Sequence, residues 1–275
     1  MSKVRTRSNP YMNANETVIV PLNHFDSDVE SLELDKGICL RRILNDEPQK
    51  LREAFPGNRD ILRFALTNTK HVLEMSAYAP INDRFAAVKR AILALKLLKP
   101  GDVTTSWEFS LDKNGGVNSM SMPSLVVQSS NPYFLKKGET EDFIELWRKL
   151  RDIEKEKPYL SYPLYQFTKV FEEKSSEDKI VEYMTLSESL VFYGEETPEP
   201  AGKVIGIAIG MLIGRNQEER DRIKATFTSS YTARNLRVHG NTKKFESFRK
   251  KHDIGKLSLS VEECIRRVLR KLIEE

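Results

Sequence analysis

Glycine occurs at every fourth position of an apolar stretch in the second half of the chain, at Gly202, Gly206, Gly210 and Gly214. On a helix this spacing makes a shallow groove that drifts by about 40° per step, and another backbone can approach closely along it. Each interior glycine costs about 1 kcal/mol relative to alanine, so close packing has to compensate. A nucleotide-binding loop is disfavoured, because no Gly-Lys-Ser/Thr follows and no strand precedes. We therefore interpret residues 202–214 as a tightly packed core helix.

Amphipathic patterns predict further helices on both sides of this stretch. Ser175 and Ser260 each have an acidic residue three positions later, which is the spacing of a capping box, so we expect helices to begin there. The apolar positions are Phe143, Leu146, Trp147, Leu150 and Ile153 in the first pattern, and Val261, Ile265, Val268, Leu269 and Leu272 in the last. Four basic residues of the last pattern are expected on a solvated face: Arg266, Arg267, Arg270 and Lys271.

The sequence patterns in the first half of the chain predict strands mixed with helices. Its strand patterns are bounded by glycine-containing turns, which favour hairpins. The expected elements are a strand at 16–21, hairpins at 31–40 and 103–128, a helix near Pro48 capped by Asn45 or Asp46, and a helix from Asn82 to Leu98. This half contains no phosphate loop, clustered histidines or serine-centred glycine elbow. We find no independent catalytic centre in it.

These patterns predict an α+β N-terminal domain of unknown role over residues 1–137, followed by an all-α helical bundle over residues 138–275. The net charge of +4 permits contact with nucleic acid without requiring it. Cys39 and Cys264 lie far apart and have no metal-ligand spacing, which favours buried thiols in a reducing compartment. No secretory signal or membrane-spanning run is recognisable. We expect a cytoplasmic protein that contacts no membrane.

A permanent cation and a titratable imidazole lie five residues apart at the end of a helical pattern, in the segment Arg234-Asn235-Leu-Arg-Val-His239. An arginine holds two phosphate oxygens in its planar fork, and a histidine gains and loses a proton near neutral pH. The pair therefore suits phosphoryl chemistry without a metal. The alternative to a catalytic role is a structural one, in which the arginine is exposed and the histidine has its hydrogen bonds satisfied at a helix end.

The helical half resembles the HEPN domain, and within it the ApeA-like group. The resemblance covers roughly Glu139–Glu275, and the supporting segments occur in the family's order. They are Phe143–Trp147, Glu182–Leu190, Lys203–Gly214 and Tyr231–Gly240. This similarity implies a bundle that dimerises through the helical domain, so that two Arg/His sets face one cleft. It also implies a metal-independent endoribonuclease, often a toxin or phage-defence effector, with an antitoxin or regulator as a partner.

Arg234, Asn235 and His239 fall on the family's active motif and are our catalytic candidates. In RNA the 2′-hydroxyl can attack its own phosphodiester, giving a 2′,3′-cyclic phosphate and a 5′-hydroxyl. His239 would act as general base or acid, and Arg234 would meet the charge that develops on phosphorus. Asn235, four residues before His239, would orient the imidazole or bind phosphate. The expected substrate-binding residues are Arg237, Tyr231 and Lys203, with no metal or other cofactor.

Two alternatives to this reading stay open. The helical half would otherwise be a non-catalytic module that dimerises and binds RNA, a nucleotide or another protein. For Glu188 and Lys203 we favour an ordinary surface or intrahelical ion pair. Five residues of ideal helix place Arg234 and His239 about 140° apart, so they share no face. A twofold mate would bring one copy's His239 to the other's Arg234, and we therefore expect an inactive monomer.

Overall fold

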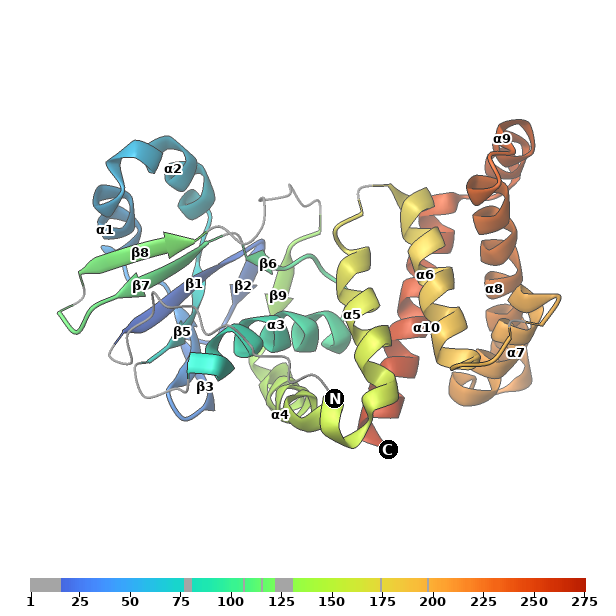
Figure 1. Ribbon diagram of the computed structural model, residues 1–275, viewed down its shortest axis with the longest axis horizontal. Coiled ribbons are helices and arrows are strands. Elements are labelled where there is room, and N and C mark those ends of the chain that lie inside the picture. Colours follow the sequence, from blue (N-terminus) through green and yellow to red (C-terminus); the bar gives the residue numbers. More distant parts are fainter. Residues whose placement is uncertain are drawn as a thin grey trace, which may run out of the picture. The chain divides into compact units, whose positions relative to one another are not determined.

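The computed structural model describes residues 16–76, 81–105, 107–114, 116–121, 131–173, 175–196 and 198–275. The chain forms two compact units. Unit 1 comprises residues 1–95 and 101–147, and unit 2 comprises residues 96–100 and 148–275. A β-sheet region thus precedes a helical region (Figure 1), as the sequence predicts. The domain boundary at 137/138 stays a prediction. No helix in the described part of the chain is long and apolar enough to cross a membrane.

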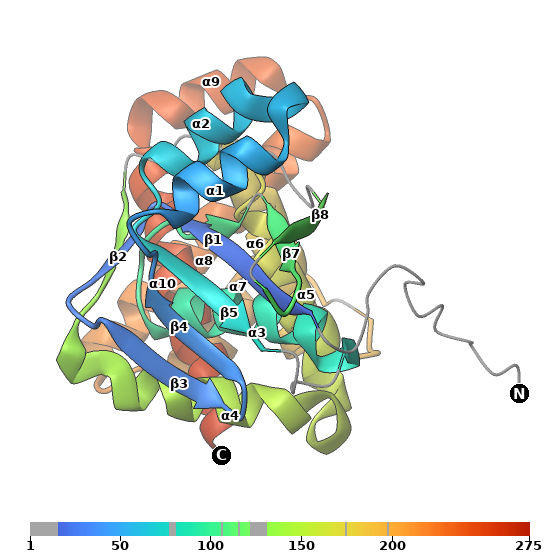
Figure 2. The ribbon, with the colours of Figure 1, turned by 90° about the vertical axis from the view of Figure 1, so that its left-hand side faces the viewer.

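Unit 1 contains a large antiparallel sheet and a separate, short pair of parallel strands. The strands are β1 (Thr17–Asn23), β2 (Phe25–Ser27), β3 (Ser31–Asp35), β4 (Ile38–Arg42), β5 (His71–Met75), β6 (Thr104–Thr105), β7 (Glu108–Leu111), β8 (Val117–Ser121) and β9 (Tyr133–Leu135). The main sheet has the order β3-β4-β5-β1-β7-β8, with β6 also paired to β1, and β2 pairs with β9. Figure 2 shows β3, β4, β5 and β1 side by side. The predicted strand at 16–21 and the hairpin at 31–40 are confirmed. In the second predicted hairpin β7 pairs with β8, and residues 122–128 lie outside the described part.

Strand β1 is the centre of this sheet, and six of its seven residues are buried. Its middle contains Pro21, which has no N–H to donate to a neighbouring strand. Residues 17–19 of β1 pair with β7, and residues 22–23 pair with β6. Among the described residues, the pairs on that edge do not include Pro21, the residue that lacks a donor.

The helices of unit 1 in the described part of the chain include α1 (Glu47–Ala54), α2 (Arg59–Thr67) and most of α3 (Ile81–Leu98). Side chains from α1 and α2 share one apolar cluster with the start of the β7 hairpin, formed by Leu51, Leu62, Leu66, Trp107 and Phe109. Asp46 is the N-cap of α1, as one of the two predicted caps, although its side chain makes no capping hydrogen bond. Helix α3 begins at Ile81, so Asn82 lies inside the helix and not at its cap.

From residue 140 onward the described elements are helical. They are α4 (Thr140–Glu156), which continues from unit 1 into unit 2, α5 (Ser161–Val170), α6 (Ser176–Val191), α7 (Ala201–Ile213), α8 (Gln217–Val238), α9 (Thr242–Lys251) and α10 (Ile254–Glu274). Short 3-10 segments lie at Pro56–Asn58, Lys137–Glu139 and Pro158–Leu160. The predicted cap at Ser175 is confirmed, because its hydroxyl accepts a hydrogen bond from the amide of Asp178 at 3.0 Å.

The last helix, α10, begins earlier than the capping-box pattern predicts. Its N-cap is Asp253, whose carboxylate accepts a hydrogen bond from the amide of Lys256 at 3.0 Å. Ser260 lies inside the helix, where its hydroxyl donates to the carbonyl of Lys256 at 2.9 Å. The prediction of a helix start at Ser260 is therefore wrong, because an aspartate seven residues earlier caps the first turn and the helix runs uninterrupted from there.

Among the basic residues of α10, Arg266 is buried, which corrects the expectation that it faces solvent, whereas Lys271 is exposed as predicted and Arg267 and Arg270 are partly buried. Arg266 is only 3% exposed, donates through Nε to the carbonyl of Lys96 at 2.8 Å, and forms ion pairs with Glu262 and Glu263. Arg270 reaches the carbonyl of Leu98 at 3.5 Å. The last turn of α3 belongs to unit 2, and its carbonyls have no partner within their own helix. Cations therefore compensate the negative end of that helix.

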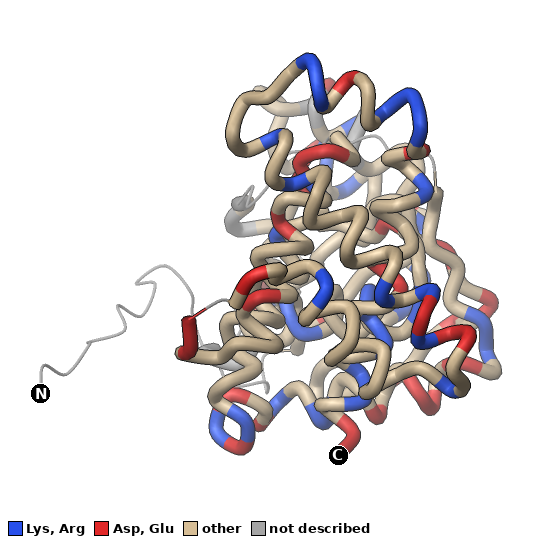
Figure 3. Tube along the Cα trace, turned by 90° about the vertical axis from the view of Figure 1, so that its right-hand side faces the viewer, with Lys and Arg blue, Asp and Glu red and all other residues tan. Residues whose placement is uncertain are grey.

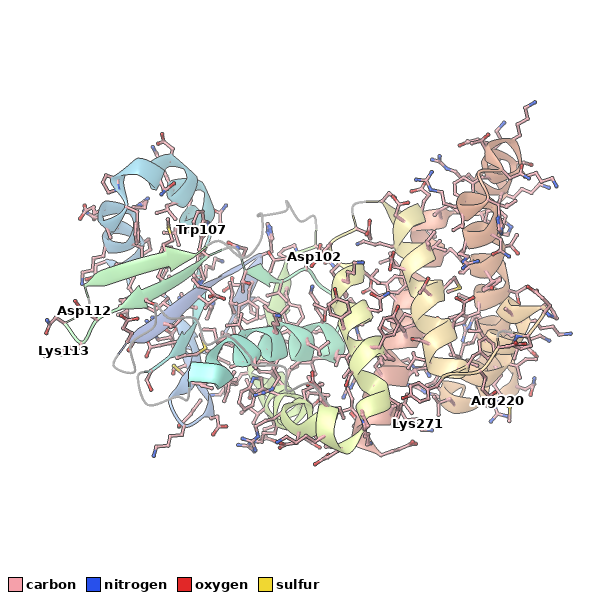
Figure 4. The ribbon with its side chains drawn as sticks, in the orientation of Figure 1. Asp102, Trp107, Asp112, Lys113, Arg220 and Lys271 are labelled. Carbon is pink, nitrogen blue, oxygen red and sulfur yellow. The ribbon has the colours of Figure 1, made fainter. Side chains whose placement is uncertain are left out.

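Two further cations of α10 bind the end of α7 in the same way. Arg267 donates to the carbonyl of Ile213 at 2.5 Å, and Lys271 donates to the carbonyl of Leu212 at 2.9 Å. Arg220, at the start of α8, adds a longer contact of 3.4 Å to the carbonyl of Gly214. Figure 4 labels Lys271 and Arg220 at this end of the bundle. The periodic pattern alone could not show this, because the carbonyl partners belong to other helices.

Candidate functional site

The glycine face of α7 packs directly on α8, the helix that carries the Arg/His motif. A β-carbon at Gly206 would lie 2.7 Å from the α-carbon of Lys224, and one at Gly202 would lie 2.5 Å from the β-carbon of Tyr231. At Gly210 the nearest atom is the carbonyl oxygen of Arg220, at 3.2 Å. The prediction of a glycine groove that admits another backbone is confirmed. This backbone belongs to the same chain, so α7 fixes the position of α8.

Helix α8 ends in a Schellman motif immediately after the candidate site. The amide of Gly240 donates to the carbonyl of Arg237 at 3.2 Å, and the amide of Asn241 donates to that of Leu236 at 3.0 Å. Gly240 has a φ of 65°, a conformation that glycine adopts without a steric penalty. Gly240-Asn241 therefore caps the helix as predicted, and His239 occupies the C-cap position.

Arg234 lies at the centre of a small polar cluster formed by α8 and α6. Its Nη1 donates to the side-chain oxygen of Asn235 at 3.0 Å, and its Nη2 lies 4.0 Å from a carboxylate oxygen of Glu188. Its guanidinium carbon is 5.5 Å from the ring centroid of Tyr231. The Nε atom is buried and has no hydrogen-bond partner among the described residues. One edge of the guanidinium, Nε with Nη2, thus makes no hydrogen bond.

Tyr231 connects this cluster to α6. Its hydroxyl donates to Glu188 at 2.7 Å, and its ring packs against the backbone at Gly202. Partial burial and the neighbouring Glu188 carboxylate raise the pKa of Tyr231 to about 12, because both disfavour the phenolate. Tyr231 is therefore a neutral hydrogen-bond donor near neutral pH.

His239 and Arg237 lie on the exposed end of α8. The amide of His239 donates to the carbonyl of Asn235 at 3.0 Å, which fixes the backbone that carries the imidazole. Arg237 forms an ion pair with Asp178 at 3.1 Å. Hydrogen bonds from Ser175 and then from Arg237 lower the pKa of Asp178. Arg237 is half-exposed, and its charge is partly neutralised within the chain.

Of the site residues predicted from the sequence, Tyr231, Arg234 and Asn235 lie together in this cluster. His239 lies one turn further along, at the helix end. Lys203 is exposed in the first turn of α7, beside Gly202, and forms no hydrogen bond or ion pair with the cluster in the described part of the chain. Asn235 contacts Arg234 through its side chain and His239 only through its backbone carbonyl. The predicted role of Asn235 in orienting the imidazole stays a prediction.

Sequence reasoning missed the part played by α6. Glu188 was expected to form a surface or intrahelical ion pair, but it binds Tyr231 and approaches Arg234 across two helices. Asp178 was recognised only as part of a cap, and it also binds Arg237. No signal in the local sequence reports a pairing between residues more than 40 positions apart.

The described residues contain no group of three or more His, Cys, Asp or Glu side chains arranged to hold a metal ion. No protein-family model matches the chain, and no match was found among curated proteins or solved structures. The chemistry of the side chains around Arg234 is therefore the basis for a functional assignment.

Proposed function

We propose that this chain is a metal-independent endoribonuclease of the HEPN type. The observation that carries the proposal is the Nε–Nη2 edge of Arg234, which makes no hydrogen bond within the described chain although Nε is buried. A buried donor without an acceptor costs about 1–3 kcal/mol. This edge has the spacing that binds two oxygens of a phosphate, and the Arg234 side chain is 25% exposed. Because Nε has almost no accessible surface in this conformation, a phosphodiester completes the hydrogen bonding of Arg234 only after this side chain turns toward solvent.

The exposed imidazole of His239 supplies the proton transfers. The 2′-hydroxyl of the substrate loses its proton to a neutral imidazole, and its oxygen bonds to the adjacent phosphorus. The bond from phosphorus to the 5′-oxygen breaks, and this oxygen takes a proton from an imidazolium. The products are a 2′,3′-cyclic phosphate and a 5′-hydroxyl, and no water is consumed in this step. Arg234 stabilises the negative charge on the phosphoryl oxygens in the transition state.

A dimer explains how both side chains reach one phosphate. Along α8 the two residues are five positions apart, which puts them about 140° apart around the axis, and no contact joins them in the described chain. Two copies related by a twofold axis supply two imidazoles and two guanidiniums at one cleft. His239 of one copy then meets Arg234 of the other copy at the same phosphate, and this imidazole acts in turn as base and as acid.

The first test compares RNA cleavage by the full-length wild type and the His239→Ala variant in excess chelator, with tRNA and mRNA as substrates. His252→Ala is the matched control, because His252 is also an exposed histidine of unit 2 and stacks on Phe248 at 4.2 Å. We expect His239→Ala to lose about 10²- to 10⁴-fold in rate, and His252→Ala to cleave normally. New 5′ ends should accept phosphate from a polynucleotide kinase without prior dephosphorylation. Equal rates for His239→Ala and the wild type would contradict the proposal.

The second test asks whether the site is shared between copies. Arg234→Ala and His239→Ala subunits, each inactive alone, are mixed after partial unfolding so that mixed dimers form. A shared site predicts that some cleavage returns, because one mixed site then contains an intact Arg234 and an intact His239. Size-exclusion chromatography with light scattering verifies that dimers are present. Mixed dimers without activity would show that each copy uses its own pair.

The proposal extends to a role as a toxin or phage-defence effector, which needs a partner that restrains it. Expression in a bacterial host is then expected to arrest growth, and His239→Ala should relieve the arrest while His252→Ala does not. Growth arrest by His239→Ala at equal protein levels would separate toxicity from RNA cleavage.

A non-catalytic binding module is the second candidate. It is favoured by one observation, that Asn235 and Glu188 already engage the Nη atoms of Arg234. In this case RNA binds without turnover, and His239→Ala leaves the affinity unchanged.

A further inference from the structure

Positive charge is concentrated in one short segment that includes the candidate site. Residues 234–252 contain seven lysine or arginine residues and a single glutamate, a net charge of +6, whereas the whole chain carries +4. The remainder of the protein is therefore slightly acidic. In Figure 3 the blue segments at the top, interrupted by one red segment, belong to α9. A field of this kind attracts polyanions to the end of unit 2.

The arginines and the lysines of this segment have different surroundings. Each arginine is paired with a carboxylate of α6: Arg234 with Glu188, Arg237 with Asp178, and Arg249 with Glu177 at 3.6 Å. The lysines are exposed and form no ion pair within the described chain: Lys243, Lys244, Lys250 and Lys251. Arg237 and Arg249 thus hold α8 and α9 against α6, and the lysines are available to an external anion.

Helical geometry places these lysines on one ridge. Lys243 and Lys250 are seven residues apart, as are Lys244 and Lys251, so each pair forms a row about 10 Å long on one side of α9. Ser247 lies between the two rows. Phe245, the one buried residue of α9, points to the opposite side. The outer face of α9 therefore presents four ammonium groups and a hydroxyl.

The ridge is held in a fixed relation to His239. Asn241 is the residue whose amide closes the Schellman motif of α8, and its side chain also accepts a hydrogen bond from the amide of Lys244, at 3.4 Å, as the N-cap of α9. Only Gly240 and Asn241 separate the imidazole from the first turn of α9. A strand bound along the ridge therefore leads directly to the end of α8.

A polyanion with regularly spaced charges fits this surface better than a membrane does. Helices that lie in a membrane interface insert an apolar face, whereas the apolar face of α9 is buried within unit 2 through Phe245. The outer face carries no apolar side chain. Phe248 and His252 stack on each other beside the ridge, so these rings already have a partner within the chain.

We propose that Lys243, Lys244, Lys250 and Lys251 form a phosphate-binding ridge that holds single-stranded RNA beside the scissile linkage. This inference rests on the proposed function, because it places the ridge next to the Arg234 and His239 site. The lysines bind the backbone and carry no sequence information, so they set affinity and its dependence on salt.

The experiment measures binding of fluorescein-labelled oligouridylate by anisotropy, with all variants in a full-length His239→Ala background that does not cleave. Two double variants remove one row each, Lys243→Gln with Lys250→Gln, and Lys244→Gln with Lys251→Gln. Glutamine preserves the helix propensity of α9. The control, Lys113→Gln with Lys155→Gln, removes the same charge from the exposed β7–β8 turn and from α4.

Each phosphate contact to single-stranded RNA contributes about −0.7 to the slope of log affinity against log salt concentration. We expect each ridge variant, which removes two contacts, to have a slope that is about 1.4 less steep than that of its parent. Between about 50 and 200 mM salt, the affinity of the parent should therefore fall by a factor about seven times larger than that of the variant. The control should retain the parental slope. Equal slopes for the ridge variants and the control would overturn the ridge, and so would absence of RNA binding by the parent. Binding to vesicles of anionic lipid in place of RNA would assign the surface to a membrane and also overturn it.

Failure of the proposed function gives a different result. If cleavage does not depend on His239 while the ridge variants still change the salt slope, RNA binding by the ridge is supported and catalysis by this site is rejected. If cleavage depends on His239 but the ridge variants and the control have equal salt slopes, the catalytic site is supported and the ridge is rejected.

Discussion

The phenol of Tyr231 donates a hydrogen bond of 2.7 Å to the carboxylate of Glu188, and this contact joins α8 to α6 beside Arg234. It occupies one oxygen of Glu188, while the other lies 4.0 Å from Arg234. The carboxylate is therefore held between a neutral donor and a cation. Glu188 determines which donors of Arg234 stay available to a phosphate, since it approaches Nη2 without forming a hydrogen bond.

This contact predicts a loss of stability at alkaline pH. The fold raises the pKa of Tyr231 from 10.0 to about 12, so folding favours the neutral phenol. The contribution of Tyr231 to the free energy of unfolding is complete below pH 10 and is lost as pH rises through about 12. Urea unfolding of wild type and Tyr231→Phe should show a difference that changes over this window. Glu188→Gln removes a charge that opposes the phenolate, so the loss should still begin near pH 10 but should be smaller and end at lower pH. Identical windows for Glu188→Gln and wild type would count against the contact.

Features set by neighbouring residues could be predicted from the sequence. The Ser175 cap, the hairpin at 31–40 and the Schellman end at Gly240 each depend on a few consecutive residues. The close approach at Gly206 was also predictable, because only tight packing compensates for repeated glycine in a helix. The partner of that groove was not, since the spacing does not reveal which backbone fills it.

Features set by distant residues could not be predicted. Arg266 belongs to an amphipathic pattern that assigns it to the solvent side, and its burial depends on the carbonyl of Lys96, 170 positions away. Glu188 reaches Tyr231 over 43 positions. In both cases the position of a charged side chain depends on a helix end or a polar group from a distant part of the chain. The periodicity of the local sequence does not indicate such a partner.

The glycine contact predicts that Gly206→Ala destabilises unit 2. The added β-carbon would lie 2.7 Å from the α-carbon and 2.9 Å from the carbonyl oxygen of Lys224, and a helix backbone cannot move away without shifting α8. Overpacking of this kind costs typically 1–3 kcal/mol, which is partly offset by about 1 kcal/mol from helix propensity. Gly138→Ala is the control, because no atom lies within 4 Å of its added β-carbon. Urea unfolding should give a lower midpoint for Gly206→Ala only.

The end of α8 predicts a cost that comes from backbone conformation alone. Gly240 has a φ of 65°, and an added β-carbon would meet no atom within 4 Å. Gly240→Ala should therefore lose about 1–2 kcal/mol of unfolding free energy, the cost of the left-handed region for an L-residue. Gly240→Asn should lose less, because asparagine tolerates this region. Equal losses for the two variants, measured by urea unfolding, would show that backbone strain is not the cause.

The buried arginine of α10 gives the largest expected effect on stability. Arg266 is 3% exposed and Glu262 is 7% exposed, and the phenol of Tyr183 donates to the same carboxylate at 2.9 Å. Arg266→Met leaves a buried charge unpaired and the carbonyl of Lys96 without its donor, which should cost about 3–5 kcal/mol. Arg270→Met is the matched control, because the Arg270 side chain is 33% exposed and water replaces it at the helix end.

A second variant separates loss of the ion pair from loss of packing. Glu262→Gln in the Arg266→Met background removes the unpaired charge and retains an oxygen that accepts from Tyr183. Part of the lost free energy should return, because an amide is far cheaper to bury than a carboxylate. The measurement is the urea midpoint of the single and double variants at neutral pH. A double variant no more stable than Arg266→Met would mean that the carbonyl of Lys96 and the side-chain volume, and not the pairing with Glu262, account for the cost.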